Sequence, residues 1–570
     1  MTCATLDLLG RRANNAKTGL AHQNTGGWAM TVVRRAAWST EAGQAGGWPT
    51  SLTWYAVAIR EMKKLTPRLE EFSPLAMEAN ALGNRERPTR ADQQRYRDLV
   101  QAMTPILQGW SDPRGLGYQS QVHDSFLPPR AWPRHGGALV IWSECAHGNW
   151  FFLPWHRAYL LEFEQVARAH VVRLGGPADW ALPYWNSSDY RRDPQAASLP
   201  LAVRDPLLPD GLDLATENGQ PDPDRGNPLY EPSRIGPEDL LGPPSAEDWC
   251  DASGALTRHH YANSEDTQRI SFAGGYLEDL TQFHFSGEMG QVDAQPHGLG
   301  HTHTGGLMAA FSTAGLDPLF WMHHANVDRL WETYAHDLGH GYPFPDGRPA
   351  QPGLNQEAYD SWAGREFRFL RADGAVGTWK APGVTDTKAL GYEYDTVARP
   401  VFNDLMWVPS GQDVDAFGVV RGRRRFTAVA AAIDVRISQR VTVLLTSGEP
   451  GEDGSGLVGP TTLWNVRFDG LRCHAPAQTS YAVYIDLDDG VERDPARLIG
   501  VLSLFGVFEA SLEANGDVGR TRLLEATGVV RALPSFDPFS ARLTLIPANP
   551  DRDLAAVALT AERISLEVAE

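Results

Sequence analysis

Histidines gather in three short segments of the chain, at spacings that suit a metal site. Residues 145–157 (CAHGNWFFLPWHR) contain two histidines, and residues 297–306 (HGLGHTHTGG) contain three more. His297 and His301 are four residues apart, so a single helical turn would project both imidazoles from one face and let them share an ion. Residues 317–331 (DPLFWMHHANVDRLW) could then supply a third ligand from a separate helix.

A phenylalanine precedes a histidine by four residues in two of these segments. Phe152 stands before His156, and Phe320 stands before His324. Side chains four residues apart meet on one face of a helix. We therefore expect each phenylalanine to stack over the imidazole that follows it and to limit the rotation of that ring.

The donor set restricts the choice of metal. Three neutral imidazoles per ion, with no thiolate and no carboxylate, suit copper, zinc, iron or nickel rather than magnesium or calcium. Two such triads side by side would hold two divalent ions with no protein anion between them, and a bridging anion derived from dioxygen could offset that repulsion. Six neutral nitrogens also stabilise cuprous ion, so both oxidation states of a copper pair would be accessible.

The segments that must position these histidines read as helices. Apolar spacing predicts amphipathic helices over residues 54–64 and 91–103, a long apolar helix over residues 151–168 and another helix over residues 317–334. Residues 194–249 are crowded with Pro, Gly and Asp, which predicts a long surface loop.

The pattern changes near residue 426 to short β-rich runs that Gly, Asp and Pro separate, as in a β-sandwich. The expected strands lie within residues 427–437, 440–445, 462–468, 481–487, 498–508, 520–530, 541–546 and 554–568. We expect four parts: an N-terminal tail (1–30), a helical domain (31–395), a linker (396–426) and a C-terminal β domain (427–570). Residues 421–425 (RGRRR) read as a solvated linker or as a proteolytic processing site.

Length and composition exclude several classes of protein. A chain of 570 residues with 42% hydrophobic and 21% charged residues is globular and long enough for about three domains. Its net charge of -19 argues against a nucleic-acid partner, because phosphate binding needs an excess of Lys and Arg. No apolar run reaches the roughly 18 residues of a membrane-spanning helix, and none near the start resembles a secretory signal, so we expect a cytoplasmic protein. Four widely spaced cysteines argue against a disulfide scaffold and against a thiolate zinc site.

The histidine motifs carry a family resemblance. Residues 151–160 together with residues 317–331 closely resemble the tyrosinase and polyphenol oxidase family of type 3 copper proteins. The resemblance extends over residues 31–395, and residues 390–394 (LGYEY) are similar to the tyrosine motif that closes the catalytic domain of that family. The β-rich remainder resembles the C-terminal domain of plant-type and latent polyphenol oxidases. The resemblance implies a mainly α catalytic domain, whose four-helix-bundle core holds two copper ions, followed by an all-β sandwich domain.

The resemblance also implies a set of copper ligands. The ligands are His123, His147 and His156 for the first copper, and His297, His301 and His324 for the second. His135 is the alternative to His123, which we favour because residues 118–124 (YQSQVHD) read as a helix end followed by a loop. His323 is expected to be a neighbour whose ring points elsewhere.

Other residues are expected to support these ligands. Cys145 lies two residues before His147, where relatives form a thioether to a ligand imidazole, and a buried thiol is the alternative. Asp328 could accept a hydrogen bond from a ligand ring or from Arg157, as partners of metal-bound histidines commonly do. A surface salt bridge is the alternative for Asp328.

Three residues are expected to act on the substrate. Glu288 occupies roughly the place where relatives keep a carboxylate that holds a water near the second copper, and such a base could deprotonate a phenol; a solvated loop acid is the alternative. Gly298 stands where many strong tyrosinases have Asn, which favours diphenol oxidation over monophenol hydroxylation. Thr302 and His303 are expected to line the pocket.

The implied reaction is the oxidation of ortho-diphenols to ortho-quinones by O2, with monophenol hydroxylation less favoured. The β domain is either a packing module or a cover that keeps the enzyme latent, and residues 504–508 (LFGVF) contain candidates for the covering side chain. An ortho-aminophenol oxidase and an oxygen carrier similar to mollusc hemocyanin stay open as alternatives. Phenols and O2 are the expected partners, and an oligomer is compatible with the sequence.

Overall fold

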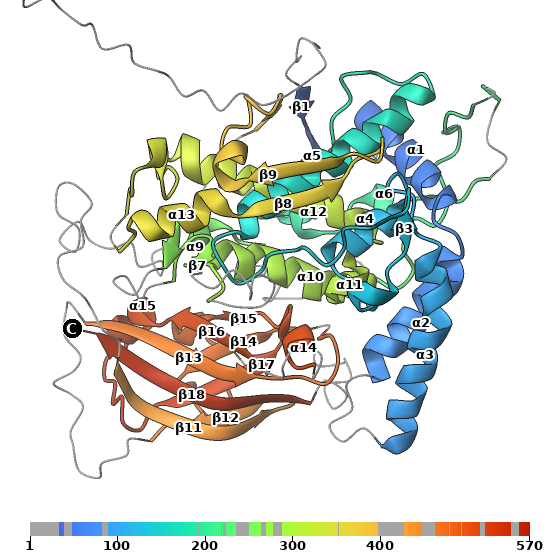
Figure 1. The fold of residues 1–570 in the computed structure, drawn as a ribbon. Helices are drawn as coiled ribbons and strands as arrows, with labels where there is room; N and C mark the ends of the chain where they lie inside the picture. Colours follow the sequence, from blue (N-terminus) through green and yellow to red (C-terminus); the bar gives the residue numbers. More distant parts are fainter. Residues whose placement is uncertain are drawn as a thin grey trace, which may run out of the picture.

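The structure is a computed structural model with a helical domain packed on a β domain (Figure 1). It describes residues 33–38, 48–82, 89–190, 193–217, 219–220, 224–234, 250–263, 270–276, 288–351, 353–396, 427–446, 462–477, 479–491, 493–512, 519–548 and 558–569. The expected tail and nearly all of the expected linker lie outside these residues, so the domain boundaries stay predictions.

The helical domain is built around α5 (Phe152–Arg173) and α12 (Pro318–Glu332). The two helices pack so closely that the rings of Phe163 and Trp321 stack with centroids 3.5 Å apart and planes 6° apart. Asp317 caps α12 by accepting a hydrogen bond from the Leu319 amide, which satisfies a donor that the first helical turn leaves open. Both helices confirm the expectation from apolar spacing, with α5 extending further than predicted.

The helical domain contains further helices. They are α1 (Thr50–Lys64), α2 (Leu69–Leu82), α3 (Arg90–Gln108), α4 (Leu116–His123), α6 (Leu201–Arg204), α9 (Ser253–Leu256), α10 (Leu299–Thr304), α11 (Phe311–Ala314) and α13 (Gln356–Gly364). The sequence analysis did not predict α2, which contains Pro74, a residue that is unfavourable inside a helix. The expected loop over residues 194–249 is irregular where it is described, apart from α6 and the short η4 (Pro194–Ala197).

Short strands tie the ends of the helical domain together. β1 (Val33–Arg35) pairs in parallel with β10 (Tyr392–Tyr394), and β8 (Glu366–Leu370) pairs antiparallel with β9 (Val376–Lys380). The minor two-residue strands are β2 (Ala37–Trp38), β3 (Arg134–His135), β4 (Ala138–Leu139), β5 (Tyr184–Trp185), β6 (Ala262–Asn263) and β7 (Gly274–Gly275).

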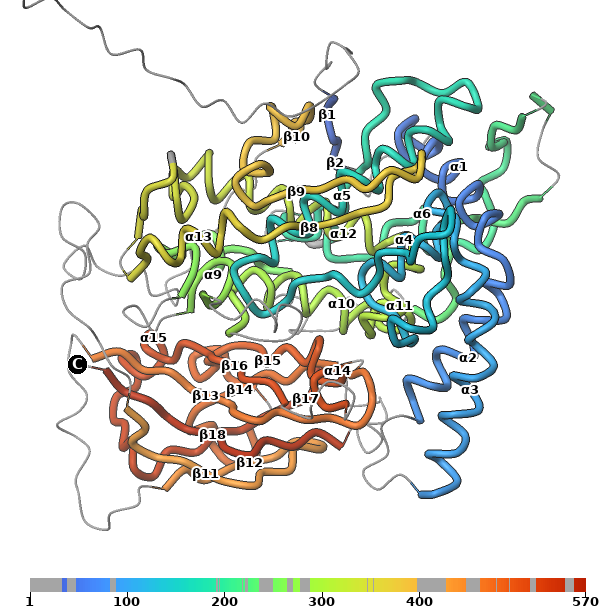
Figure 2. The backbone as a smooth tube through the Cα atoms, viewed as in Figure 1, coloured from blue at the N-terminus to red at the C-terminus, as the bar shows by residue number. Residues whose placement is uncertain are grey.

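The β domain is a sandwich of two four-stranded sheets with the orders β11-β18-β13-β16 and β12-β17-β14-β15 (Figure 2). The strands are β11 (Thr427–Ile437), β12 (Val441–Leu444), β13 (Leu463–Leu471), β14 (Tyr481–Ile485), β15 (Leu498–Leu502), β16 (Arg520–Glu525), β17 (Arg542–Pro547) and β18 (Leu559–Ala569). The expected fold class, a mainly α domain followed by an all-β sandwich, is confirmed. Two expected strands were too long: the chain leaves β15 for the short helix α14 (Val507–Ala510), and it leaves β16 for α15 (Thr527–Ala532).

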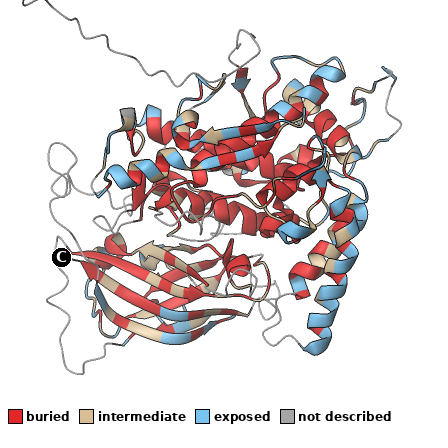
Figure 3. Ribbon diagram, viewed as in Figure 1, coloured by how far each residue is buried: buried red, intermediate tan, exposed pale blue. Residues whose placement is uncertain are grey.

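The β domain packs beneath α10 and α11, so its upper edge faces the elements that carry the second histidine segment (Figures 1 and 2). Buried residues fill both the helical core and the interior of the sandwich, whereas much of α2 and α3 is exposed (Figure 3). Across the interface, Arg467 Nη1 lies 2.9 Å from Glu288 Oε1, and His303 Nε2 lies 2.8 Å from Ser480 Oγ. None of the helices within the described residues is long and apolar enough to cross a bilayer.

Candidate metal centre

Three imidazoles of the first half of the chain meet in the helical core. His123 ends α4, His147 lies in the loop before α5, and His156 lies in the first turns of α5. Their ring centroids are 5.1 Å (His123–His147), 4.8 Å (His147–His156) and 5.7 Å (His123–His156) apart, and all three residues are buried. The structure therefore assembles the triad expected for the first copper.

A second triad comes from η6 (Asp293–Gly298), α10 and α12, which supply His297, His301 and His324. The ring centroid of His297 lies 4.7 Å from those of His301 and His324. The two triads touch, since the rings of His156 and His324 stack with centroids 4.6 Å apart and planes 11° apart. Two ions bound by these triads would be close neighbours.

Hydrogen bonds orient most of the rings. Nδ1 of His123, His156 and His301 donates to the carbonyls of Phe311, Phe152 and Met308 at 2.9, 2.8 and 2.8 Å. Because each Nδ1 carries the proton, Nε2 carries the lone pair of these neutral imidazoles. The backbone thus fixes the tautomer that a metal ion requires.

The ring nitrogens that remain fit a metal ion. Nε2 of His156, Nε2 of His297 and both ring nitrogens of His147 are buried without a hydrogen-bond partner among the described residues, which is rare for buried polar atoms. The Nε2 atoms of His301 and His324 lie 3.2 Å apart. Two nitrogens bound at about 2.0–2.1 Å to one tetrahedral ion would be roughly 3.3 Å apart, so the spacing suits a shared ion.

Burial also favours the state in which these histidines bind metal. Desolvation, followed by repulsion from neighbouring imidazoles, lowers the pKa of His147, His156, His301 and His324 well below the usual value. The neutral rings keep their lone pairs at neutral pH, and a cation can use them.

The alternative first ligand, His135, lies apart from this cluster. It belongs to the two-residue strand β3, is only partly buried, and has its Nδ1 3.0 Å from the carbonyl of Ser111. His323 is buried, and its Nε2 donates to the carbonyl of His297 at 3.1 Å. A Cβ at Gly300 would lie 2.4 Å from the His323 ring, so this close packing needs glycine there.

The two phenylalanines contact the expected histidines, but they do not stack face to face. Phe152 and His156 have ring centroids 4.7 Å apart and planes inclined by 56°, and Phe320 and His324 have values of 4.2 Å and 40°. The expectation of stacked rings was wrong because each ring also packs against other aromatic side chains, such as His297 beside Phe152. The contacts still restrict the rotation of both histidines.

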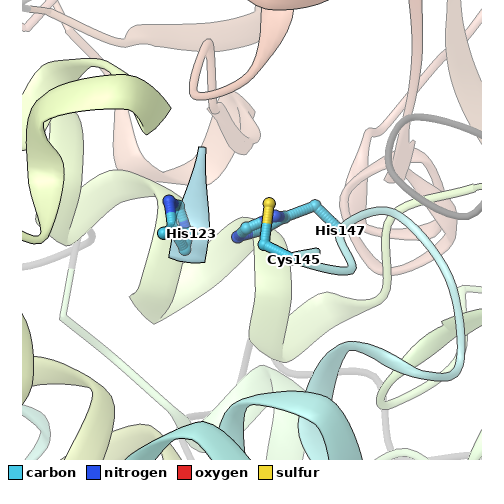
Figure 4. Close-up of side chains that lie close together, drawn as sticks. All are labelled: His123, Cys145 and His147. Carbon is cyan, nitrogen blue, oxygen red and sulfur yellow. The ribbon is translucent and has the colours of Figure 1, made fainter. Parts of the chain in front are cut away.

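Cys145 lies beside His123 and His147 of the first triad, as Figure 4 shows. Its sulfur and ring nitrogens of His123 and His147 all lie within 4.8 Å of one another, and the cysteine forms no disulfide. Burial raises the pKa of its thiol well above the usual value. The position suits a thioether to His147, and the cross-link stays a prediction.

Asp328 lies one helical turn after His324 and is not a surface residue. Its Oδ1 accepts a hydrogen bond from Arg157 Nε at 2.5 Å, and its Oδ2 accepts from the hydroxyls of Tyr392 and Tyr394 at 2.6 Å. All of these side chains are buried or partly buried, and Asp328 therefore joins α12 to α5 and β10. Its role is to fix the helix that carries His324.

The carboxylate against the second triad is that of Asp293, which the sequence analysis missed. Its Oδ1 accepts from His297 Nδ1 at 3.0 Å, and its Oδ2 accepts from the Gly148 amide at 2.7 Å. One fully buried side chain thus ties a ligand of the second triad to the backbone beside His147. The spacing of four residues between Asp293 and His297 was a signal that could have revealed it.

Glu288 lies in the interface with the β domain. Its carboxylate accepts hydrogen bonds from Asn263 Nδ2 at 3.2 Å and from Arg467 Nη1 at 2.9 Å. Thr302 is buried, and its hydroxyl donates to carbonyls of its own helical turn, those of Gly298 and Leu299 at 3.2 Å. The structure places neither side chain in hydrogen-bond contact with a ligand imidazole, so their expected roles stay proposals.

A side chain of the β domain covers the centre. The ring of Phe505 stacks on His301 with centroids 4.0 Å apart and planes 8° apart, and its centroid lies 5.4 Å from that of His297. Arg522 holds the loop by donating to the carbonyls of Ser503 and Phe505 at 3.1 and 2.8 Å. Among the expected candidates of residues 504–508, Phe505 is therefore the side chain over the histidines.

Gly298 contacts the loop of the β domain that carries Ser503 and Phe505. A Cβ at Gly298 would lie 2.6 Å from Ser503 Oγ and 3.3 Å from Phe505 Cβ. A larger side chain at this position would displace the loop of the β domain. The absence of a side chain at Gly298 thus leaves room for the loop that carries Ser503 and Phe505.

Comparison with known proteins agrees with this geometry. Residues 114–337 match the family model of the common central domain of tyrosinase, and residues 453–568 match a domain of unknown function, DUF7868. Tyrosinase HcTyr1 of Hahella sp. (strain CCB-MM4) is 28% identical over 489 residues, which are 80% of this chain and 92% of that protein. The chloroplastic polyphenol oxidase of Malus domestica is 26% identical over 338 residues, which are 57% of this chain and 49% of that protein. The chain thus spans about half the length of this plant relative.

A solved structure of latent aurone synthase, a polyphenol oxidase, shares the fold. Its TM-score is 0.50 at 17% identity, with 95% of this chain and 90% of that chain covered. A helical domain with two buried histidine triads, which matches the central domain of tyrosinase, supports a copper oxidoreductase that acts on phenols. Residues 114–337 thus match the central domain of the tyrosinase family, and the similarity to tyrosinases and polyphenol oxidases supports this family for the chain.

Proposed function

We propose that this protein is a type 3 copper polyphenol oxidase that oxidises ortho-diphenols to ortho-quinones with O2 and that its β domain holds it latent. One observation carries the proposal. The Phe505 ring lies parallel to the His301 imidazole at a centroid distance of 4.0 Å, beside the nitrogens that would hold copper. The pocket therefore accepts a flat aromatic ring next to the metal site, and a catechol could take that place once the cover leaves.

The protein would supply the binding and orientation of both reactants. When bound, the two copper ions would exchange electrons between the diphenol and O2. The substrate ring would stack on His301 where Phe505 now lies, and Asp293 would keep Nε2 of His297 directed at its ion. Aromatic walls such as Phe311 would exclude water from the reacting groups.

Glu288 is proposed as the acceptor of a substrate proton. Its carboxylate is engaged by Arg467 of the β domain, so departure of that domain would release it. Gly298 has no side-chain amide that could orient a water toward such a base, and we therefore propose that diphenol oxidation exceeds monophenol hydroxylation. Monophenol hydroxylation stays the second activity to test, because one relative is named a hydroxylase: (+)-larreatricin hydroxylase, from Larrea tridentata, is 26% identical over 332 residues.

The test is the rate of O2 uptake with a catechol, with the matching monophenol and with an ortho-aminophenol. A specific protease site inserted among residues 397–426 allows each rate to be compared before and after cleavage. We expect the catechol to be oxidised fastest and cleavage to raise that rate. Reversible O2 binding without turnover of any substrate would instead identify an oxygen carrier, and a faster aminophenol reaction would identify an aminophenol oxidase.

A further inference from the structure

Glu509 of the β domain reaches across the interface into the helical domain. It lies on α14, four residues after Phe505, and only 3% of its surface is exposed. Its Oε1 accepts a hydrogen bond from the backbone amide of Phe311 at 2.7 Å. A buried carboxyl of one domain thus binds the first residue of α11 in the other.

Phe311 is the residue at which the cover and the first triad meet. Its carbonyl accepts from His123 Nδ1 at 2.9 Å, and its ring stacks on His147 with centroids 4.3 Å apart. The same ring lies 4.6 Å from that of Phe505. Glu509 therefore holds a residue that contacts two ligand imidazoles and the covering side chain at once.

The turn between Phe505 and α14 is shaped for this double contact. Gly506 has a φ of +76°, which favours glycine, and a Cβ there would lie 2.9 Å from the Phe311 ring. Glycine therefore lets the chain pass close to Phe311, with Phe505 on one side of the turn and Glu509 on the other.

We propose that Glu509 is a proton-dependent latch, which holds the β domain on the catalytic domain when its carboxyl is neutral and loosens the domain when it ionises. This latch rests on the proposed latency of the enzyme, and it names Glu509 as the group that would control that latency. Glu509 acts through Phe311 and touches neither substrate nor metal, so it is a positioning residue.

The surroundings of Glu509 support this role. The pKa of Glu509 is raised to about 7: burial is the main cause and the nearby Asp124 at the end of α4 adds to the rise, whereas the hydrogen bond from the Phe311 amide and Arg520 on β16 oppose it. Cys145 and Cys473 also face this carboxyl from the two domains. A negative charge on Glu509 is therefore costly in the docked state and costs little once water reaches it.

The direction of the pH effect follows from linkage. The docked carboxyl has the raised pKa and the undocked carboxyl has the ordinary one near 4.5, so docking binds a proton. Docking is then strongest at low pH and weakens as the pH rises through about 7, beyond which it stays constant. Each pKa unit corresponds to a tenfold change, so we expect docking to weaken by roughly one to two orders of magnitude between about pH 5 and about pH 8.

The experiment measures docking without copper or turnover. Two fluorophores are attached through unnatural amino acids at the exposed positions Val376 and Ile433, one in each domain of the full chain. Energy transfer is then recorded across this pH range for the metal-free wild type, Glu509→Gln and Glu509→Leu. Glu525→Gln is the matched control, because Glu525 is also an interface glutamate, paired with Arg258.

We expect energy transfer between the two fluorophores to fall as the pH rises, both in the wild type and in Glu525→Gln. Glu509→Gln, which keeps an acceptor but cannot ionise, should stay docked at every pH, and Glu509→Leu should dock weakly throughout. Three results would overturn the latch. Energy transfer in the wild type could be independent of pH, Glu509→Gln could show the same pH dependence as the wild type, or Glu509→Gln could be undocked at every pH. If the latch holds but the cleaved, copper-loaded enzyme does not oxidise catechol, the proposed function fails and the latch stands.

Discussion

Replacement of Phe505 by alanine is expected to raise the catechol oxidation rate of the uncleaved enzyme by about one to two orders of magnitude. Truncation of a buried phenylalanine typically costs about 3–5 kcal/mol, and even part of that loss would multiply the population of open molecules. The substitution also removes the ring that now stacks on His301. The measurement is the initial rate of O2 uptake, compared with the rate after removal of the β domain. Since Phe505 would be absent from the cleaved catalytic domain, variant and wild type should then react equally fast.

Two further variants distinguish the loss of the covering side chain from a general destabilisation of the β domain. Phe536→Ala removes a phenylalanine that packs on Trp464 inside the same β domain, and it should leave the enzyme latent. Gly298→Asn would push against Ser503 from the catalytic side and should raise the latent rate. If Phe505→Ala were no more active than Phe536→Ala, Phe505 would not be the cover.

Substitution of Asp293 by asparagine is expected to lower the affinity for the second copper, and the catechol oxidation rate, by about 10- to 100-fold, the usual cost of losing a partner of a metal-bound histidine. The carboxylate accepts from both His297 Nδ1 and the Gly148 amide, whereas an amide can accept with its oxygen only. One buried donor would lose its carboxylate partner, and the His297 ring would be oriented less firmly, because the backbone carbonyl of residue 293 would be its remaining acceptor at Nδ1. Copper content after dialysis and catechol oxidation by the cleaved enzyme measure the two effects.

Glu288→Gln is the matched control in the cleaved enzyme. Glu288 bonds Asn263 and Arg467 rather than a ligand imidazole, so this variant should keep both copper ions. Because Glu288 is the proposed proton acceptor, Glu288→Gln should lower the oxidation rate of a monophenol more than that of a catechol. Loss of copper in Glu288→Gln together with full occupancy in Asp293→Asn would reverse the roles given to these two carboxylates.

The sequence was sufficient to predict most of the helical core and of the candidate site. Apolar spacing predicted α5 and α12, and the motifs predicted six histidines, whose rings the structure brings together. Short β-rich runs separated by Gly, Asp and Pro located the eight strands of the sandwich, although they did not show where β15 and β16 end. Local patterns succeed here because each element buries a regular face.

The remaining features depend on contacts between distant parts of the chain. The hydrogen bond from Phe311 to Glu509 joins residues 198 positions apart, and no local pattern marks either partner. The choice of Phe505 among five residues depends on the turn at Gly506 and on the clamp by Arg522, which exist only in the folded interface. The spacing of Asp293 to His297 is visible in the sequence, but its second contact, with the Gly148 amide 145 residues away, exists only in the folded chain.

The central claim is that six imidazoles hold two copper ions in this chain, and metal analysis of the copper-loaded protein tests it most directly. Copper per chain would be measured by mass spectrometry in the wild type, in His123→Ala and in His135→Ala. We expect two copper ions in the wild type and in His135→Ala, because the His135 ring lies outside the cluster, and fewer than two in His123→Ala. A single zinc ion per chain, or loss of copper in His135→Ala alone, would contradict the claim.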